Sequence, residues 1–125
     1  MHYQQHSREA PMRRVCALND LEPGEGLRID DTSPPIAVFL TEEGTVHAID
    51  DTCTHQDASL AAGWVEDCRV ECPLHASAFS LLTGEADQPP ARRPVRVHRA
   101  EVHDGEVWVE VSTAAPNLPP GVTLP

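Results

Sequence analysis

The segment CTHQDASLAAGWVEDCRVECPLH, residues 53–75, contains two cysteines and two histidines at short spacings. Cys53 and His55 form a Cys-x-His pair, Cys72 and His75 form a Cys-x-x-His pair, and 16 residues separate the pairs. Two thiolates and two imidazoles suit zinc or an iron–sulfur cluster. Zinc fingers usually place two cysteines on one knuckle and two histidines on a helix, whereas each segment here supplies one of each. The pattern therefore favours a two-iron cluster with cysteines on one iron and histidines on the other.

The whole chain is consistent with a metal centre in a reducing compartment. Its 125 residues suffice for one domain with a real core. No apolar run approaches the roughly 20 residues of a membrane span, and the N-terminus lacks the pattern of a secretory signal. We therefore expect a cytoplasmic protein without a membrane partner, in which clustered cysteines bind metal more readily than they form disulfides.

The charge balance is strongly acidic. Twenty acids face nine bases, all of them arginine, for a formal charge of −11. This balance argues against nucleic acid as a partner. Residues 41–75 carry eight of the acids, including Glu66 and Asp67, against Arg69 alone. Two interpretations stay open for this acidic face: a solvated surface, or a docking face for a basic partner.

Outside residues 53–75, short strand-like segments alternate with turn signals. The segment VWVEV places Val107 and Val109 on one face, and Asp104-Gly105 before it predicts a hairpin turn. No helix of ordinary length is expected, except a short turn near DASLAAG. The fold class is therefore all-β, a small sandwich or partly open barrel with the Cys/His segments as loops at one end. We expect a disordered extension over residues 1–11, a domain over 12–112 and a flexible tail over 113–125.

The two Cys/His pairs resemble the motif of Rieske [2Fe–2S] proteins. The resemblance extends roughly from Arg13 to Val111 and includes GLRIDDTSPPIAVFL, HAIDDTCTHQDASLAAGWVE, ECPLHASAFSLLTGEA and DGEVWVEV. These segments look like those of bacterial Rieske ferredoxins, the electron carriers of multicomponent aromatic-ring dioxygenases, with the phenylpropionate and cinnamate subgroup the most similar. The resemblance implies one [2Fe–2S] cluster per chain. Its ligands would be Cys53 and Cys72 on the inner iron and His55 and His75 on the outer iron near solvent, with residues 88–94 as a covering third loop.

The resemblance also implies partners. A flavin-dependent ferredoxin reductase would supply single electrons, and a terminal oxygenase would receive them, so that this chain would not itself be an enzyme. Two alternatives stay open. One is the small subunit of an assimilatory nitrite reductase, a relative that commonly lacks the cluster ligands. The other is a zinc-stabilised interaction module, which would be colourless.

Departures from the respiratory Rieske proteins predict the redox behaviour. Those proteins carry a disulfide between their cluster loops, but the corresponding positions here are Ala58 and Leu74. Ser77 matches the serine whose hydroxyl bonds a cluster sulfide, and Phe79 replaces the partner tyrosine. Hydrogen bonds to sulfur and solvent exposure tune the potential. We therefore predict a potential near the lower end of the Rieske range, about −150 mV.

Five further residues have simpler interpretations. Cys16 lies in an apolar strand and is expected to be a small buried hydrophobe. Cys68 is a conceivable rival ligand, but using it would discard a histidine from a well-formed motif. His47, His98 and His103 occupy strand-like or turn positions, where histidines are ordinarily on the surface or hydrogen-bonded.

Three large side chains near the motif each have two interpretations. Trp64 either packs in the core, which we expect, or covers the cluster loop. Arg92 and Arg93 lie in the third loop, inside an acidic domain. They either orient a partner or pair with neighbouring acids.

Overall fold

The computed structural model describes residues 11–55, 57–74, 77–87, 89 and 91–122. The fold is almost entirely β, as the sequence predicts, and the expected extension over residues 1–11 lies outside the described residues except for Pro11. The elements are β1 (Arg13–Ala17), β2 (Gly26–Ile29), β3 (Ile36–Leu40), β4 (Val46–Asp50), β5 (Trp64–Glu66), β6 (Arg69–Glu71), β7 (Ala78–Ser80), β8 (Val97–His103) and β9 (Glu106–Glu110), with 3₁₀ turns η2 (Leu18–Asp20) and η3 (Leu60–Ala62). In the part of the chain that the structure describes, no helix is long and apolar enough to cross a bilayer.

Six strands form one antiparallel sheet in the order β1-β9-β8-β4-β3-β2. Side chains of β3 alternate between two apolar clusters, because successive residues of a strand point to opposite faces. Ile36 and Val38 join the cluster that contains Cys16, Val107 and Val109. Cys16 is therefore a small buried hydrophobe, as predicted. Val107 and Val109 form the inward face of the last strand, which is also as predicted.

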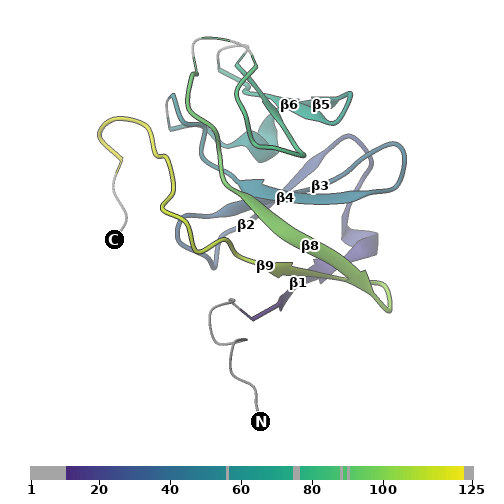
Figure 1. Ribbon diagram of the computed structural model, residues 1–125. Coiled ribbons are helices and arrows are strands. Elements are labelled where there is room, and N and C mark those ends of the chain that lie inside the picture. The colour runs from purple at the N-terminus through teal and green to yellow at the C-terminus, as the bar shows by residue number, and fades with distance from the viewer. Residues whose placement is uncertain (1–10, 56, 75–76, 88, 90, 123–125) are drawn as a thin grey trace.

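The second sheet, β5-β6-β7, lies between and beside the two halves of the motif: the first half precedes β5, and Cys72 follows β6. Figure 1 shows this small sheet and the loops around it at one end of the molecule, with β1 at the other. Ala37, Phe39 and Ile49 of the large sheet pack in one apolar cluster with Cys53 and Cys72. The loops expected at one end of the fold therefore rest on a core to which both sheets contribute.

Two hairpins turn through two successive residues of positive φ. Asp104 and Gly105 have φ of 52° and 76° between β8 and β9, which confirms the predicted turn. Asp67 and Cys68 have φ of 54° and 58° between β5 and β6, where neither residue is glycine. The second turn was not predicted, because a turn with two positive φ values usually carries Asn-Gly or Asp-Gly.

Trp64 corrects one prediction. Its side chain is 63% exposed, so it does not pack in the core. The reason is the alternation of β5, in which Val65 is half-buried against the core and its two neighbours point outward. Trp64 instead lines a surface cavity with the turn before β2.

Candidate functional site

The two motif loops begin in the same way. Cys53 follows β4 and donates its backbone N–H to the Ala58 carbonyl, at 3.0 Å. Cys72 follows β6 and donates its N–H to the Ser77 carbonyl, at 2.6 Å. Both cysteines are 1% exposed and belong to one apolar cluster. The fold thus brings together two thiols that stand 19 positions apart in the sequence and shields them from water.

The one motif histidine that the structure describes, His55, lies in different surroundings from the two cysteines. His55 is exposed, two residues beyond a buried cysteine. His75 lies outside the described residues, and its neighbour Leu74 is 57% exposed. For the described part of the motif, the sulfur ligands expected from the sequence are therefore inside and the imidazole is at the surface.

The third loop is hydrogen-bonded to both motif loops. Its Ala91 donates a backbone N–H to Ser77 Oγ at 3.0 Å, and Thr54 Oγ1 donates to the Arg93 carbonyl at 2.7 Å. Ala91 and Val95 are buried in the apolar cluster that holds the two cysteines. Ala91 and Arg93 of the expected third loop thus contact the motif loops, while residues 88 and 90 lie outside the described residues.

The buried carboxylate of Asp51 is hydrogen-bonded to the segment that follows the first Cys/His pair. Asp51 is 1% exposed, and its Oδ1 accepts hydrogen bonds from the Ser59 hydroxyl and the Ala61 N–H, both at 2.9 Å. Its Oδ2 accepts none from the described residues, and Arg28 Nη1 lies 3.4 Å away. Burial raises the pKa of Asp51, and the bonds from Ala61 and Ser59 offset part of that rise. Asp51 therefore fixes η3 against the segment that leads into Cys53.

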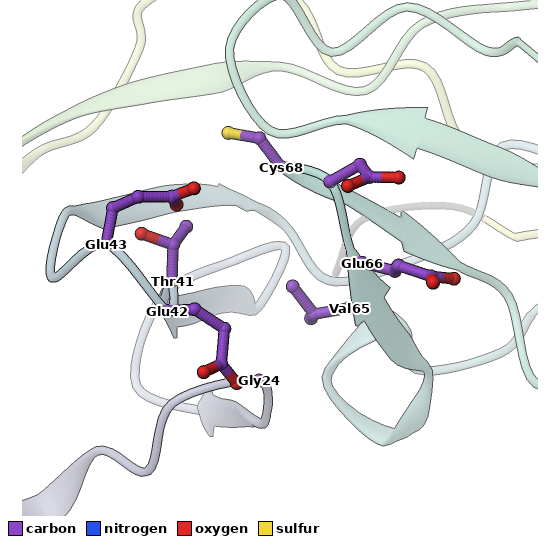
Figure 2. Close-up of a pocket in the computed structure, with 8 residues that line it drawn as sticks. Gly24, Thr41, Glu42, Glu43, Val65, Glu66 and Cys68 are labelled. Atoms are coloured by element: carbon purple, nitrogen blue, oxygen red, sulfur yellow. The ribbon is translucent and has the colours of Figure 1, made fainter.

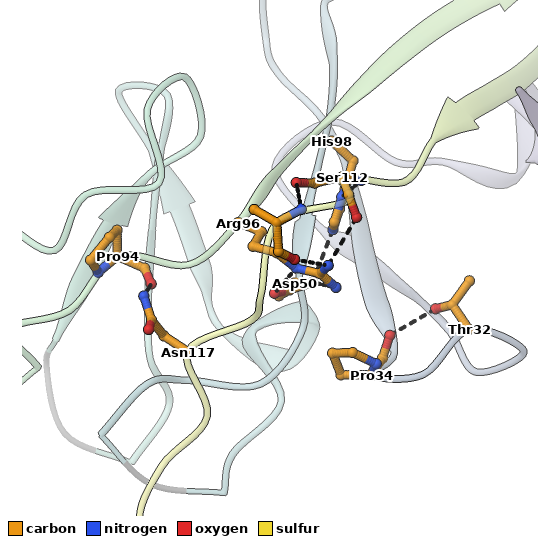
Figure 3. Close-up of polar contacts among 9 residues, drawn as sticks. Thr32, Pro34, Asp50, Pro94, Arg96, His98, Ser112 and Asn117 are labelled. Carbon is orange, nitrogen blue, oxygen red and sulfur yellow. Dashed lines mark hydrogen bonds and ion pairs between the residues drawn. The ribbon is translucent and has the colours of Figure 1, made fainter. Parts of the chain in front are cut away.

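A second buried carboxylate, Asp50, joins β4 to β8 and to the chain beyond β9 (Figure 3). Arg96 donates to both Asp50 oxygens at 2.9 and 3.1 Å, and His98 Nε2 lies 2.9 Å from Oδ1. Ser112 donates its N–H to His98 Nδ1, so the ring proton is on Nε2. Burial alone raises the pKa of Asp50, but the bonds from His98 and Arg96 outweigh burial and hold it below its usual value. His98 is thus a satisfied buried histidine, as expected.

The segment after β9 reaches back to the third loop. Arg96 Nη1 donates to the Ser112 and Ala114 carbonyls at 3.0 and 2.9 Å. Further along, Asn117 donates to the Pro94 carbonyl at 3.0 Å (Figure 3), and Arg93 Nη2 donates to the Leu118 carbonyl at 2.6 Å. As predicted, residues 113–122 form no helix or strand, but these bonds attach them to the site. Their flexibility and the boundary at residue 112 stay predictions.

Four acids of the acidic face line a cavity of about 370 Å³ (Figure 2). Glu42 and Glu43 come from the turn after β3, and Glu66 and Asp67 come from the β5–β6 hairpin. None of these four carboxylates is in an ion pair with a described residue. The choice between solvated surface and docking face stays open.

Cys68 lines this same cavity, with its sulfur 3.7 Å from His47 Nε2. Burial raises the pKa of the Cys68 thiol and lowers the pKa of His47, so burial disfavours the charged form of both groups. His103 is exposed and bonds Glu101. His47 and His103 therefore both have ordinary structural surroundings.

A second cavity, of about 410 Å³, lies beside the motif. Thr54 and His55 of the first loop line it together with three residues of the third loop and one from the end of the chain, Ala91, Arg92, Arg93 and Pro120. Sequence reasoning missed the contributions of Thr54 and Pro120, because nothing in the local pattern connects them with the motif. Thr54 is connected to the third loop by its bond to the Arg93 carbonyl, and the chain just before Pro120 is connected to that loop by the Arg93–Leu118 bond.

Comparisons with known proteins agree with this geometry. The family model described as "Rieske [2Fe-2S] domain" matches residues 12–99. The 3-phenylpropionate/cinnamic acid dioxygenase ferredoxin subunit of Escherichia coli (strain K12) is 43% identical over 108 residues, which cover 84% of this chain and all of the relative.

Solved structures are similar over comparable lengths. One matching chain comes from a complex of reduced oxygenase and oxidised ferredoxin in carbazole 1,9a-dioxygenase; it is 37% identical, with a TM-score of 0.73 over 79% of this chain and 92% of that one. Another is a putative NADH-dependent nitrite reductase small subunit from Mycobacterium tuberculosis, 28% identical, with a TM-score of 0.73 over 84% of this chain and 98% of that one. The family model matches most of this chain, and the E. coli relative is matched over its whole length. This chain therefore belongs to the Rieske [2Fe–2S] domain family.

Proposed function

We propose that this chain is a one-electron carrier that takes electrons from a flavin-dependent reductase and passes them to the terminal oxygenase of an aromatic-ring dioxygenase. One observation carries the proposal: two buried cysteines lie in loops that are hydrogen-bonded to a third loop, and His55 of the same site is exposed. A carrier needs a redox centre that is protected from water on one side and reachable by partners on the other. The E. coli relative, named as a ferredoxin subunit, supports the same role.

The described residues fit the family's cofactor. Cys53 and Cys72 would bind one iron of a [2Fe–2S] cluster, and His55 and His75 would bind the other. A pair of thiols in an apolar pocket suits an iron–sulfur centre, because thiolate is the ligand such clusters require. When bound, the cluster supplies a single reversible one-electron reduction. The four ligand assignments are part of the proposal.

The surrounding residues would control access and potential. The apolar cluster around Cys53 and Cys72 excludes water from the sulfur side, which favours the less charged oxidation state. Ser77 is fully buried, and its oxygen already accepts the Ala91 N–H. The hydroxyl therefore keeps its own proton to donate, and a cluster sulfide is the acceptor that we propose.

The experiment is electron paramagnetic resonance of the purified protein before and after dithionite reduction, with iron, zinc and sulfide assayed on one sample. We expect a silent oxidised state and a rhombic signal on reduction. The protein should then restore product formation by the E. coli 3-phenylpropionate/cinnamic acid dioxygenase assayed without its own ferredoxin subunit. One zinc and no sulfide per chain would overturn the proposal in favour of the zinc-stabilised module.

The nitrite reductase subunit is the second candidate, because a structure of that name is 28% identical over most of the chain. A subunit without a redox role needs no cluster ligands, whereas this chain has the full Cys-x-His and Cys-x-x-His pattern. Failure to support oxygenation, despite a reducible cluster, would move the assignment toward that second candidate. The cytoplasmic location expected from the sequence stays a prediction.

A further inference from the structure

Most of the arginines that the structure describes are in ion pairs with acids of the same chain. Of the eight arginines that the structure describes, six are in ion pairs with aspartate or glutamate, namely Arg13, Arg14, Arg28, Arg69, Arg96 and Arg99. Neither of the other two, Arg92 and Arg93, is in an ion pair with a described acid. Pairing with neighbouring acids, one of the two interpretations given for Arg92 and Arg93, is therefore not found among the described residues.

These two arginines lie next to each other and both line the 410 Å³ cavity beside His55. Both are exposed, so their guanidinium groups are available to another molecule. Arg93 uses one donor on the Leu118 carbonyl, which orients the group and leaves further N–H donors. Two positive charges thus stand beside the exposed imidazole of a chain whose formal charge is −11.

The walls of the cavity are held in place on both sides. Thr54 bonds the Arg93 carbonyl from the first loop, and Asn117 bonds the Pro94 carbonyl from the end of the chain. Pro120 also lines the cavity. Guanidinium groups bind carboxylates through paired N–H···O bonds, and a fixed backbone lowers the entropy lost on binding.

We propose that this cavity receives a carboxylate side chain from the surface of the terminal oxygenase, held by Arg92 and Arg93 beside His55. The inference rests on the proposed electron-carrier function and adds how the partner is recognised. An acidic carrier repels an acidic partner over most of its surface, so one carboxylate at this place gives a contact that only a correctly oriented partner makes. The oxygenase is the occupant because a ferredoxin relative is known in complex with one.

The first test measures affinity rather than turnover. Oxidised wild-type protein, Arg92→Gln and the matched control Arg13→Gln are titrated into the terminal oxygenase of the E. coli dioxygenase and followed by calorimetry at low salt. Arg13 lies on β1, is half-buried and is paired with Asp31, and β1 is at the end of the molecule far from the small sheet (Figure 1). We expect Arg92→Gln to weaken binding by about five- to tenfold and the control to change it less than about twofold. Equal affinities for all three proteins would overturn the proposal.

The second test needs no protein partner. Reduced protein is mixed with ferricyanide, an anion, and with hexaamminecobalt(III), a cation, in a stopped-flow instrument. Loss of one positive charge near the exposed histidine should slow the anion by about three- to tenfold and speed the cation, with Arg13→Gln nearly unchanged. Rates that follow only the net charge, equal in the two variants, would overturn the placement of a local positive field.

The outcomes separate this inference from the proposed function. Absence of a reducible cluster in the wild-type protein defeats the proposed function. A normal cluster signal in Arg92→Gln with unaltered affinity and unaltered probe rates defeats only the carboxylate site. Slower reduction of Arg92→Gln by the reductase, with unchanged affinity for the oxygenase, would overturn the choice of the oxygenase as occupant.

Discussion

Replacement of Asp50 by asparagine tests whether one buried carboxylate supports the site from a distance. The side chain of Asp50 is 2% exposed and that of Arg96 is 11% exposed, so the pair is shielded from water. Asparagine has nearly the same shape but no charge, which leaves the Arg96 guanidinium buried without its anion. Breaking a buried pair from one side costs about 3–5 kcal/mol. We expect Asp50→Asn to lose about that much stability near neutral pH.

The dependence on pH has a definite sign. The pKa of Asp50 is lower in the folded protein than its ordinary value. A lowered carboxyl pKa contributes stability above the unfolded-state value, about 3.9, and that contribution is lost as the pH falls through the folded pKa. The gap between wild type and Asp50→Asn should therefore be largest near neutral pH and should shrink below about pH 4.

Hydrogen exchange of the cluster-loaded protein is the appropriate assay, because it reports opening without destroying the cluster. A loss of 3–5 kcal/mol corresponds to core amides that exchange about two to three and a half powers of ten faster. The control is Asp31→Asn, which breaks the exposed Arg13 pair and should cost no more than about 1 kcal/mol. If Asp50→Asn exchanges no faster than Asp31→Asn, the Asp50 network does not stabilise the fold and the reasoning is refuted.

Three further substitutions give independent tests. Ser77→Ala should lower the reduction potential by about 40 mV, equivalent to about 1 kcal/mol of hydrogen bonding in a one-electron couple, and an unchanged value in voltammetry would mean that the hydroxyl does not face the cluster. Cys68→Gly should raise the free energy of unfolding in urea by about 1 kcal/mol, because φ at this turn is 58°; an unchanged or lower value would contradict this and mean that the contact with His47 contributes more than the backbone strain costs. Gly84→Ala should lower the melting temperature and cost about 2 kcal/mol or more, because a Cβ would lie 2.1 Å from the Val95 carbonyl oxygen; an unchanged melting temperature would contradict this contact.

Local sequence patterns predicted what depends on local chemistry. Strand alternation placed Val107 and Val109 inside, Asp104-Gly105 marked the hairpin, and the Cys/His spacing identified the motif loops. The family match and the buried positions of Cys53 and Cys72 agree with these predictions. The same patterns missed β5 and β6, which are only three residues long and lie between the two motif halves. A strand that short carries too few residues for alternation to be recognised.

Contacts between residues far apart in the sequence could not be predicted from local patterns. Trp64 was expected inside because large aromatic side chains are usually buried, but its position in β5 is opposite to the inward Val65. Asp50 and Arg96 are 46 residues apart, and no spacing rule pairs them. The resemblance supplied the third loop, yet it did not indicate that residues beyond 112 would contact that loop.

These contacts connect a buried carboxylate to the partner surface in three steps. Asp50 fixes Arg96, and Arg96 binds the carbonyls of Ser112 and Ala114. The chain that follows brings Asn117, Leu118 and Pro120 to the third loop, where Arg92 and Arg93 flank the cavity beside His55. Asp50→Asn should therefore weaken binding to the oxygenase as well as stability, although Asp50 is not among the residues that line the cavity. Unaltered affinity in a destabilised Asp50→Asn protein would mean that the third loop keeps its position without the end of the chain.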